Sequence, residues 1–562
     1  MAGDAEGVFE SPTLRSLPLI VSGLISVKHT LRLIAFFLGA GFIAGCTKSD
    51  TTVARANRGG VLHLSVGSEP SDLDPHTVTG TGDGKIIQSL FEPLVTFEPG
   101  TLKPLPALAE RWEISADGLR YIFHLRDARW SNHEPITAHD CVQSWRRILT
   151  PALGAEYAYF LYLISGAEAY HKGRTTDFAT VGVQAAEART LVVTLSHPAP
   201  YFLQVLLNSP GRPIHLPSAA AVGDPNNRGT KWTLPGALVS SGPFVLKEWS
   251  LNRRVVVERS PTYWDRERVR LNAVHFYPYE NADVEERAFR SGQLHMTWAL
   301  PLAKVRPLQR EKSPALRIDP LLETHFFRLN IRRPPLDDVR IRRALSLAID
   351  RDLLASKILP GGRAPAPTFV PPLLAGYTPP SRRAFDPAGA RQLLVDAGHP
   401  GGRGLAPIEV LYHNSEILRL VAEALQQMWR RELGIEIRLM NQEKKTVYES
   451  RRAGNFQLVL GTWTADYLDA TTFLDMWRSD SGNNQTAWSS PEFDELAKQA
   501  DHLVDASTRG VVLARAENLL LEAAPIIPVY FNTHVYLMDP AVKGWHPTPM
   551  DHTDYRYVAL EP

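Results

Sequence analysis

Cysteine is scarce in this chain. Only Cys46 and Cys141 occur among 562 residues, so a disulfide framework and a zinc site built on several cysteines are excluded. Cys141 lies in a helix-like stretch, HDCVQSW, and is most simply interpreted as a small core residue.

The chain also lacks an excess of charge of either sign. Lysine and arginine number 61 and the acidic residues 60, which gives a net charge of +1. This balance offers no basic field for nucleic acid, so we expect no nucleic-acid partner. A hydrophobic content of 44% is typical of a globular protein, and the length allows two or three domains.

Sequence motifs of catalysis are missing too. There is no Gly-x-Ser-x-Gly elbow, no His-Glu-x-x-His and no ligand-spaced histidine cluster. The stretch GTGDGK at 80–85 fails as a P-loop because Ile86 follows the lysine, and we interpret it as a flexible loop. We therefore predict no catalytic residues, no metal and no cofactor. A hydrolase whose residues come together from distant positions stays an alternative.

The N-terminal region has the pattern of an export signal. Lys28 and Arg32 precede an apolar run at 33–43, which ends in small residues before Cys46. This order resembles the lipobox of bacterial lipoproteins, in which the cysteine is acylated and becomes the mature N-terminus. We predict an N-terminal extension plus lipoprotein signal peptide at 1–46 and a flexible tether at 47–59. An ordinary cleavage site with an incidental cysteine is the alternative.

The rest of the chain combines strands and helices. Short alternating strands are expected in the first half and longer amphipathic helices after about residue 320. The strand–helix–strand unit at 408–413, 416–433 and 435–440 predicts a parallel crossover, and therefore a doubly wound α/β domain in the second half. The other expected strands are 61–66, 119–126, 190–196 and 253–260, and the other expected helical runs are 338–358 and 386–398.

An acid stands among aromatic residues in the stretch VLGTWTADYLDA at 459–470. The stretch reads as a buried strand that runs out into Asp466 and Asp469. Capping of the next helix explains Asp469 better than Asp466. The position of Asp466, between Trp463 and Tyr467, therefore needs another explanation.

Ordered segments along the chain resemble a known family. They match the extracellular solute-binding proteins of family 5, the peptide-binding receptors of bacterial ABC importers, from about Gly60 to Pro562. Segments that carry the resemblance include SEPSDLDPH (68–76), LAERWEISADGLRYIFHLRDARWSNHEPITAHD (108–140), LVSSGPFVLKEW (238–249), DDVRIRRALSLAIDRD (337–352), TWTADYLDATTFL (462–474) and PIIPVYF (525–531).

The resemblance implies an α/β fold with two lobes, the Venus flytrap of periplasmic binding proteins, of type II and similar to cluster C. Lobe I would comprise 60–95, 212–318 and 532–562, and an extra subdomain at 96–211 would pack on it. Lobe II would comprise 319–531. Hinge segments would lie near 319–331 and 525–532.

The implied function is capture of di- or oligopeptides for a membrane permease, without catalysis. The protein would be a monomer in the periplasm or cell envelope, anchored to the membrane through a lipid on Cys46. Murein peptides, an opine, a glycoside or a metal chelate remain alternative ligands. A peptide sensor or chaperone remains an alternative role.

The resemblance also assigns ligand-binding residues. Asp466 matches the family acid that pairs with the ligand's α-ammonium. Edge backbone would come from Thr462, Trp463 and Thr464 and, across the cleft, from the segment between Thr79 and Thr81. The remaining positions that match family ligand contacts are Tyr157, His413, Lys444 and Arg451.

Other matching positions depart from the family. Leu418 and Leu460 stand where a family member places a histidine and an arginine on the peptide carboxylate, and Thr79 replaces a second acid. We therefore expect the far end of the ligand to lie in solvent or to lack a free carboxylate. Lys444 and His413 are possible substitutes.

The lipid anchor can be tested by substitution. Cys46→Ser should release the chain from membranes or leave its precursor uncleaved, because the acylated thiol is lost. Fractionation of cells and the mass of the mature chain measure both outcomes. A processed Cys46→Ser protein that still fractionates with membranes would contradict the prediction.

Overall fold

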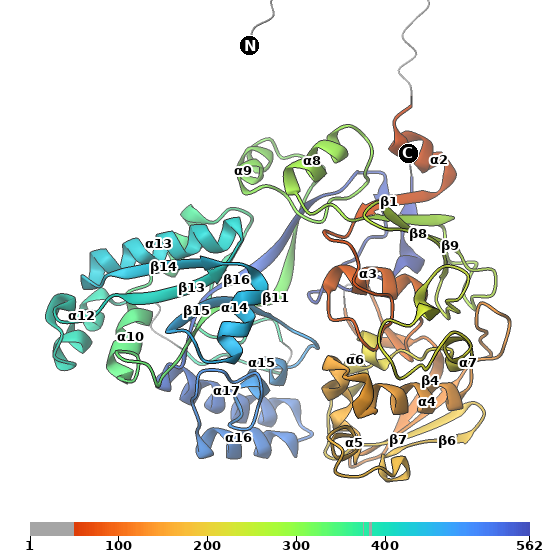
Figure 1. The fold of residues 1–562 in the computed structure, drawn as a ribbon, viewed down its shortest axis with the longest axis horizontal. Helices are drawn as coiled ribbons and strands as arrows, with labels where there is room; N and C mark the ends of the chain where they lie inside the picture. The colour runs from red at the N-terminus through yellow and green to blue at the C-terminus, as the bar shows by residue number, and fades with distance from the viewer. Residues whose placement is uncertain (1–49, 100, 375, 382–384, 562) are drawn as a thin grey trace, which may run out of the picture. The chain divides into compact units, whose positions relative to one another are not determined.

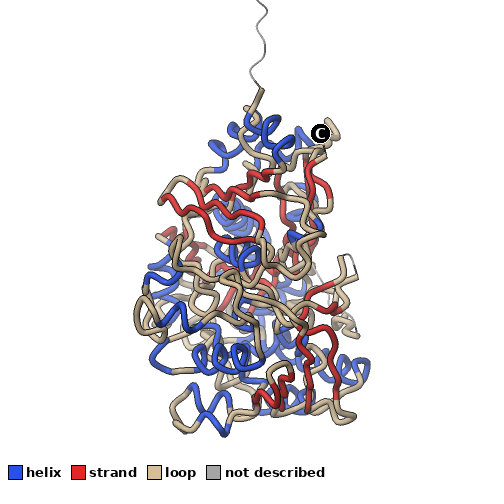
Figure 2. The backbone as a smooth tube through the Cα atoms, turned by 90° about the vertical axis from the view of Figure 1, so that its right-hand side faces the viewer, coloured by secondary structure: helices blue, strands red, loops and turns tan. Residues whose placement is uncertain are grey.

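The computed structural model describes residues 50–562 except 100, 375, 382–384 and 562. The expected signal peptide, Cys46 and residues 47–49 of the expected tether lie outside the described residues. Residues 51–562 form one compact unit that contains both helices and strands (Figure 2). Within the described residues, no helix combines the length and apolarity of a membrane span.

The first sheet has four strands, which come from residues 61–65 and 244–277, and the C-terminal part of the chain completes its core. Its order is β1-β10-β9-β8, with β1 parallel to β10 and the other neighbours antiparallel. Its core includes Tyr536, Met538 and Tyr555 from the C-terminal part of the chain. The strands are β1 (Val61–Ser65), β10 (Ala273–Tyr277), β9 (Arg254–Arg259) and β8 (Phe244–Ser250).

The second sheet, β4-β5-β7-β6, is antiparallel throughout. Helix α4 (Ala138–Leu149) belongs to the same core and begins with a capping box between Thr137 and Asp140. Cys141 is buried on α4, which confirms that it is a core residue. The strands are β4 (Ala109–Ile114), β5 (Arg120–Leu125), β7 (Thr190–Thr194) and β6 (Val183–Glu187).

The third sheet has six strands in the order β12-β16-β11-β15-β13-β14. β13 and β14 are parallel and are joined by α13 (Glu416–Leu433), which confirms the predicted crossover (Figure 1). β14 begins two residues later than predicted. The strands are β12 (Ala364–Pro365), β16 (Ile526–Leu537), β11 (Leu316–Leu329), β15 (Leu458–Thr464), β13 (Ile408–His413) and β14 (Ile437–Gln442).

The two faces of this sheet belong to different cores. Phe327 and Leu329 of β11 pack with α10 (Val339–Leu347), α12 (Pro387–Asp396) and α13. Phe326 packs with α16 (Pro491–Asp501) and α17 (Ala506–Ala523), as the alternation of side chains along a strand requires. The expected helical run at 338–358 is broken after Leu347, and short pieces follow at Arg351–Leu353 and Leu354–Ile358.

Two long strands connect the third sheet to the first. β11 and β16 pair antiparallel from Leu316↔Leu537 to Arg328↔Ile526, with an interruption between Pro320 and Thr324. Just beyond the end of β16, Met538 bridges Met296, which in turn bridges Leu64 of β1. The pair therefore belongs to the six-stranded sheet at one end and reaches the four-stranded sheet at the other (Figure 1).

Two segments predicted to be flexible are helices. The prediction of a flexible tether is wrong for α2 (Thr52–Gly59), in which Thr51 caps the first turn and Val53 and Ala56 are buried. The prediction of a flexible loop at 80–85 is also wrong, because α3 begins at Thr81 and runs to Leu90.

Tertiary contacts explain the second error. Lys85 of α3 is buried, and its Nζ lies 2.7 Å from Oδ1 of Asp551. A Cβ on Gly82 would lie 2.5 Å from the backbone oxygen of Val66, so close packing requires glycine there. Packing therefore outweighs the low helix propensity of the glycines.

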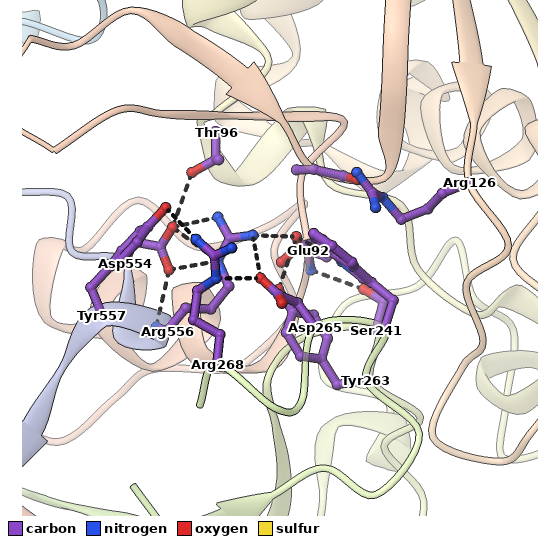
Figure 3. Close-up of polar contacts among 12 residues, drawn as sticks. Glu92, Thr96, Arg126, Ser241, Tyr263, Asp265, Arg268, Asp554, Arg556 and Tyr557 are labelled. Carbon is purple, nitrogen blue, oxygen red and sulfur yellow. Dashed lines mark hydrogen bonds and ion pairs between the residues drawn. The ribbon is translucent and has the colours of Figure 1, made fainter. Parts of the chain in front are cut away.

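A buried ionic cluster joins the C-terminal segment to Glu92 and Asp265 (Figure 3). Arg556 forms ion pairs with Asp554 at 2.5 Å, Glu92 at 3.6 Å and Asp265 at 3.9 Å. Burial raises the pKa of Glu92, and Arg556 opposes that shift. The adjoining cavity has a volume of about 60 Å³, far below the 300–1,000 Å³ of a typical ligand pocket.

Candidate ligand-binding site

β15 has one edge that is paired along its length and one that is largely open. It pairs with β11 from Leu458↔Leu329 to Thr464↔Glu323. On the other edge, β13 pairs only with Leu458 and Val459. Within the described residues, 461–464 have no strand partner on that edge. An open edge of this kind can receive an extended peptide as an added strand.

Asp466 lies two residues beyond this edge. The amide of Ala465 donates to the oxygen of Leu322 at 2.7 Å, and the amide of Asp466 donates to Oγ1 of Thr472 at 3.0 Å. The backbone oxygen of Asp466 accepts from Nδ2 of Asn208 at 2.7 Å. The backbone of Asp466 is thus fixed by hydrogen bonds through both its amide and its carbonyl group.

The carboxylate of Asp466 has one hydrogen bond and no counter-charge. Its Oδ2 accepts from the hydroxyl of Tyr159 at 3.1 Å, and no cation contacts it within the described residues. Burial raises the pKa of Asp466 to about 7, against a smaller opposing effect of Tyr159. Such a group is costly to bury in its ionised form unless a cation joins it.

Asp469, unlike Asp466, has a cationic partner within the protein. Its carboxylate accepts from both terminal nitrogens of Arg509 and from the amide of Thr471, the first residue of α15 (Thr471–Leu474). The interpretation of Asp469 as the cap of this helix is wrong, because the N-cap of α15 is Ala470 and Asp469 precedes it. Its charge is compensated within the protein, whereas that of Asp466 is not.

Asp466 lines a cavity of about 680 Å³, which is within the range of small-molecule and peptide sites. One wall comes from the end of β15 and the residues after it, including Trp463 and Tyr467. The other comes from residues in 155–205, including Tyr159 and Tyr201. Tyr467 stacks on Tyr201 with ring centres 4.7 Å apart.

Several predicted residues are brought together around Asp466. Trp463 lines the cavity and donates from Nε1 to the oxygen of Thr472 at 2.7 Å. Thr464 donates to Oε2 of Glu323 at 2.6 Å. The hydroxyl of Tyr157 lies 3.5 Å from the oxygen of Thr79, and the pKa of Tyr157 is raised by burial and by Asp466.

Thr462 and Thr81 are exposed. Thr462 belongs to the open edge of β15. Thr81 is the first residue of α3, and no described contact links its side chain to the cavity lined by Asp466.

The predicted basic residues form a separate group. Lys444 and Arg451 lie on α14 (Lys444–Arg452) on either side of Tyr448, with charges 5.8 and 4.9 Å from its ring centre. His413 ends β13, and its pKa is lowered by burial and by Lys444. None of the three lines the cavity at Asp466.

Leu418 and Leu460 are core residues. They are 2% and 1% exposed and share the core of α13. Leu418 and Leu460 therefore serve the core, and neither offers a hydrogen-bond donor to a ligand carboxylate.

Sequence reasoning missed the partners of Asp466. Tyr159 and Asn208 bind its side chain and backbone, and Gln204 accepts from the amide of Leu468 at 3.0 Å. The tyrosine-rich stretch EYAYFLYL at 156–163 was the available signal. The described residues contain no cluster of three or more His, Cys, Asp or Glu that could hold a metal.

Comparison with known proteins finds relatives that align with most of the chain. The chain is 34% identical to the periplasmic oligopeptide-binding protein OppA of Escherichia coli over 535 residues, which is 93% of this chain and 95% of OppA. It is also 34% identical to the probable deoxycholate-binding periplasmic protein YgiS of E. coli, over 92% of this chain and 96% of YgiS.

Solved structures agree with this result. The structure of Haemophilus influenzae OppA in complex with RPPGFSPFR has a TM-score of 0.78 and 31% identity, covering 90% of this chain and 99% of that one. The model of the bacterial extracellular solute-binding proteins, family 5 Middle, matches residues 103–485. The chain thus has the two-lobed α/β fold of periplasmic binding proteins. It belongs to the bacterial extracellular solute-binding proteins of family 5, which bind solutes and are not enzymes.

Proposed function

We propose that this protein captures peptides with a free α-ammonium and delivers them to the permease of an ABC importer. The observation that carries the proposal is the half-buried carboxylate of Asp466, which has no cation partner within the described residues and lies beside the open edge of β15. Main-chain bonds to that edge would supply affinity for any sequence, and Asp466 would fix the N-terminus.

The names of the relatives support a peptide more than a bile acid. Two of the compared proteins are named as oligopeptide-binding, and one as a probable deoxycholate-binding protein. A steroid carboxylate brings no cation to Asp466 and no backbone to β15. A peptide brings both, and a murein peptide with a free ammonium would satisfy the same site.

The proposed domains follow the sequence-based division. Lobe I is 60–95, 212–318 and 532–562, the extra subdomain is 96–211, and lobe II is 319–531. We place the hinge at the break between Pro320 and Thr324, where pairing of β11 with β16 is interrupted. Opening there would separate Tyr159 from Asp466 and admit the ligand. A lipid on Cys46 would hold the protein at the membrane.

Asp466→Asn tests the ammonium site. It keeps the shape of the side chain and removes its charge. Loss of one partner of a buried charge pair costs about 2–5 kcal/mol, so titration calorimetry with tetra-alanine should show affinity at least 30-fold weaker. The same substitution should raise the melting temperature of the ligand-free protein at pH 8, because the raised pKa of Asp466 means that ionisation costs the fold free energy.

Asp480→Asn is the matched control. Asp480 lies on the same cavity but is exposed, so the variant changes the net charge equally without touching the ammonium site. It should bind tetra-alanine within about twofold, as surface charges contribute little. If both variants lose affinity equally, the overall negative charge of the cavity attracts the peptide, and Asp466 has no special role. If Asp466→Asn binds tetra-alanine as tightly as the wild type, Asp466 does not bind the ammonium.

Peptide binding should weaken in acid. Asp466 has a pKa of about 7 when free, and only its ionised form attracts an ammonium. Affinity should therefore be greatest between about pH 7 and 8, fall about tenfold per pH unit below pH 7, and fall again above about pH 8, where the α-amine of the peptide loses its own proton. Calorimetry at pH 7 in buffers of different ionisation enthalpy should show proton release on binding. An affinity that is flat from pH 5 to 8 would contradict the assignment, and Asp466→Asn should make it flat.

A further inference from the structure

Arg328 is a fully buried cation, and within the described residues no hydrogen bond or ion pair of its side chain is found. It lies on β11, opposite Val459 of β15, and is 2% exposed. Its Nε and Nη1 are buried and have no hydrogen-bond partner. Its guanidinium carbon lies 4.6 Å from the ring centre of Phe326 and 5.7 Å from that of Trp477. Aromatic faces attract a cation but accept no conventional hydrogen bond.

The other buried arginines in the described part of the chain are all compensated. Arg147, Arg509 and Arg556 form ion pairs with carboxylates. Arg212, Arg342 and Arg351 donate to backbone oxygens. A buried guanidinium that serves only the fold is thus given acceptors in this protein, and Arg328 is the exception.

The surroundings of Arg328 hold donors but no acid. Burial lowers the pKa of Arg328, Arg451 on α14 lowers it further, and the only opposing group among the described residues is the hydroxyl of Tyr448, which is not a carboxylate. Nε of Arg451 and Nε1 of Trp477 are likewise buried without acceptors. Buried N–H groups of Arg328, Arg451 and Trp477 thus lack acceptors within the described residues, and unpaired donors of this kind are what an anion site offers.

This cluster lies at the end of the open edge away from Asp466. A Cβ on Gly461 would lie 3.6 Å from Nη1 of Arg328, so the guanidinium reaches β15 at the residue where the edge becomes free. From Gly461 to Asp466 an extended chain spans roughly 16 Å. Gly461 is partly exposed and Thr462 is exposed, which leaves the edge open to a ligand.

We propose that Arg328, supported by Arg451, binds a carboxylate of the peptide whose ammonium binds Asp466. The inference rests on the proposed function and adds the second charged end of the ligand. A span of roughly 16 Å corresponds to four or five extended residues. The carboxylate is therefore the C-terminus of a tetrapeptide or pentapeptide, or an acidic side chain at that distance. This replaces the expectation that the far end of the ligand lacks a partner.

The test combines a change in the ligand with a change in the protein. Tetra- and penta-alanine, as free acids and as C-terminal amides, are titrated calorimetrically into the wild type and Arg328→Met. In the wild type, amidation should weaken the better-binding peptide at least 30-fold. In Arg328→Met the free acid should bind as weakly as the amide, and the amide should bind equally well to both proteins. This coupling isolates the carboxylate–guanidinium contact.

A control variant and a further peptide sharpen the result. Arg452→Met removes the same charge from an exposed position on α14 and should leave the effect of amidation unchanged. Ala-Ala-Ala-Glu-amide distinguishes the two sources of the carboxylate. Recovery of affinity with this peptide assigns an acidic side chain, and no recovery assigns the C-terminus.

The outcomes separate the two claims. If the peptides bind through Asp466 but amidation and Arg328→Met each change affinity less than threefold, the inference is overturned and the proposed function stands. If no peptide with a free ammonium binds, the proposed function fails. The melting temperature of the ligand-free protein tests the state of Arg328 in either case. It should rise in Arg328→Met, since an uncompensated buried charge is removed, and a fall would show that Arg328 is structural.

Discussion

An ion stays inside a protein only where an opposite charge or several hydrogen bonds replace the water that it has lost. Most buried ions here meet this condition, as Arg509 with Asp469 and Lys85 with Asp551 do. Asp466 and Arg328 do not meet it within the described residues, and they have opposite signs. Asp466 follows the end of β15, and the guanidinium of Arg328 reaches β15 from the neighbouring strand β11 at Gly461. A ligand on the open edge of β15 with complementary charged ends would therefore neutralise both groups.

The same strands that place these charges also connect the two halves of the fold. β11 carries Arg328 and pairs with β15, which leads to Asp466. β11 also pairs with β16, which continues to the four-stranded sheet. Tyr159, which donates to Asp466, lies in the part of the chain that precedes β11. A ligand that neutralises the site therefore acts on groups from both sides of the proposed hinge.

Local patterns in the sequence predicted a useful part of this structure. The crossover at 408–440 was recognisable because Val421, Leu425 and Trp429 repeat at helical spacing between two β-rich runs. Asp466 was found because an acid among aromatics is unusual and because the segment resembles a family. Sequence alone could not supply Tyr159 and Asn208, which are separated from Asp466 by more than 250 residues.

Other errors have physical causes of their own. The glycines of α3 suggest a loop, and only the burial of Lys85 and the tight approach at Gly82 make a helix there. The helix at Thr52–Gly59 was missed because its composition is polar and only Val53 and Ala56 are buried. Arg328 left a visible signal, because it interrupts the apolar run HFFRL of a buried strand. A charge at such a position requires either a partner or a function.

The central claim is that the ligand is a short peptide with both ends charged. Mass spectrometry of the molecules released when the natively purified protein is denatured tests it most directly. The account predicts peptides with a free α-ammonium and a carboxylate four or five residues away, without a fixed sequence. A bound population of steroid acids, or of peptides blocked at the N-terminus, would contradict it.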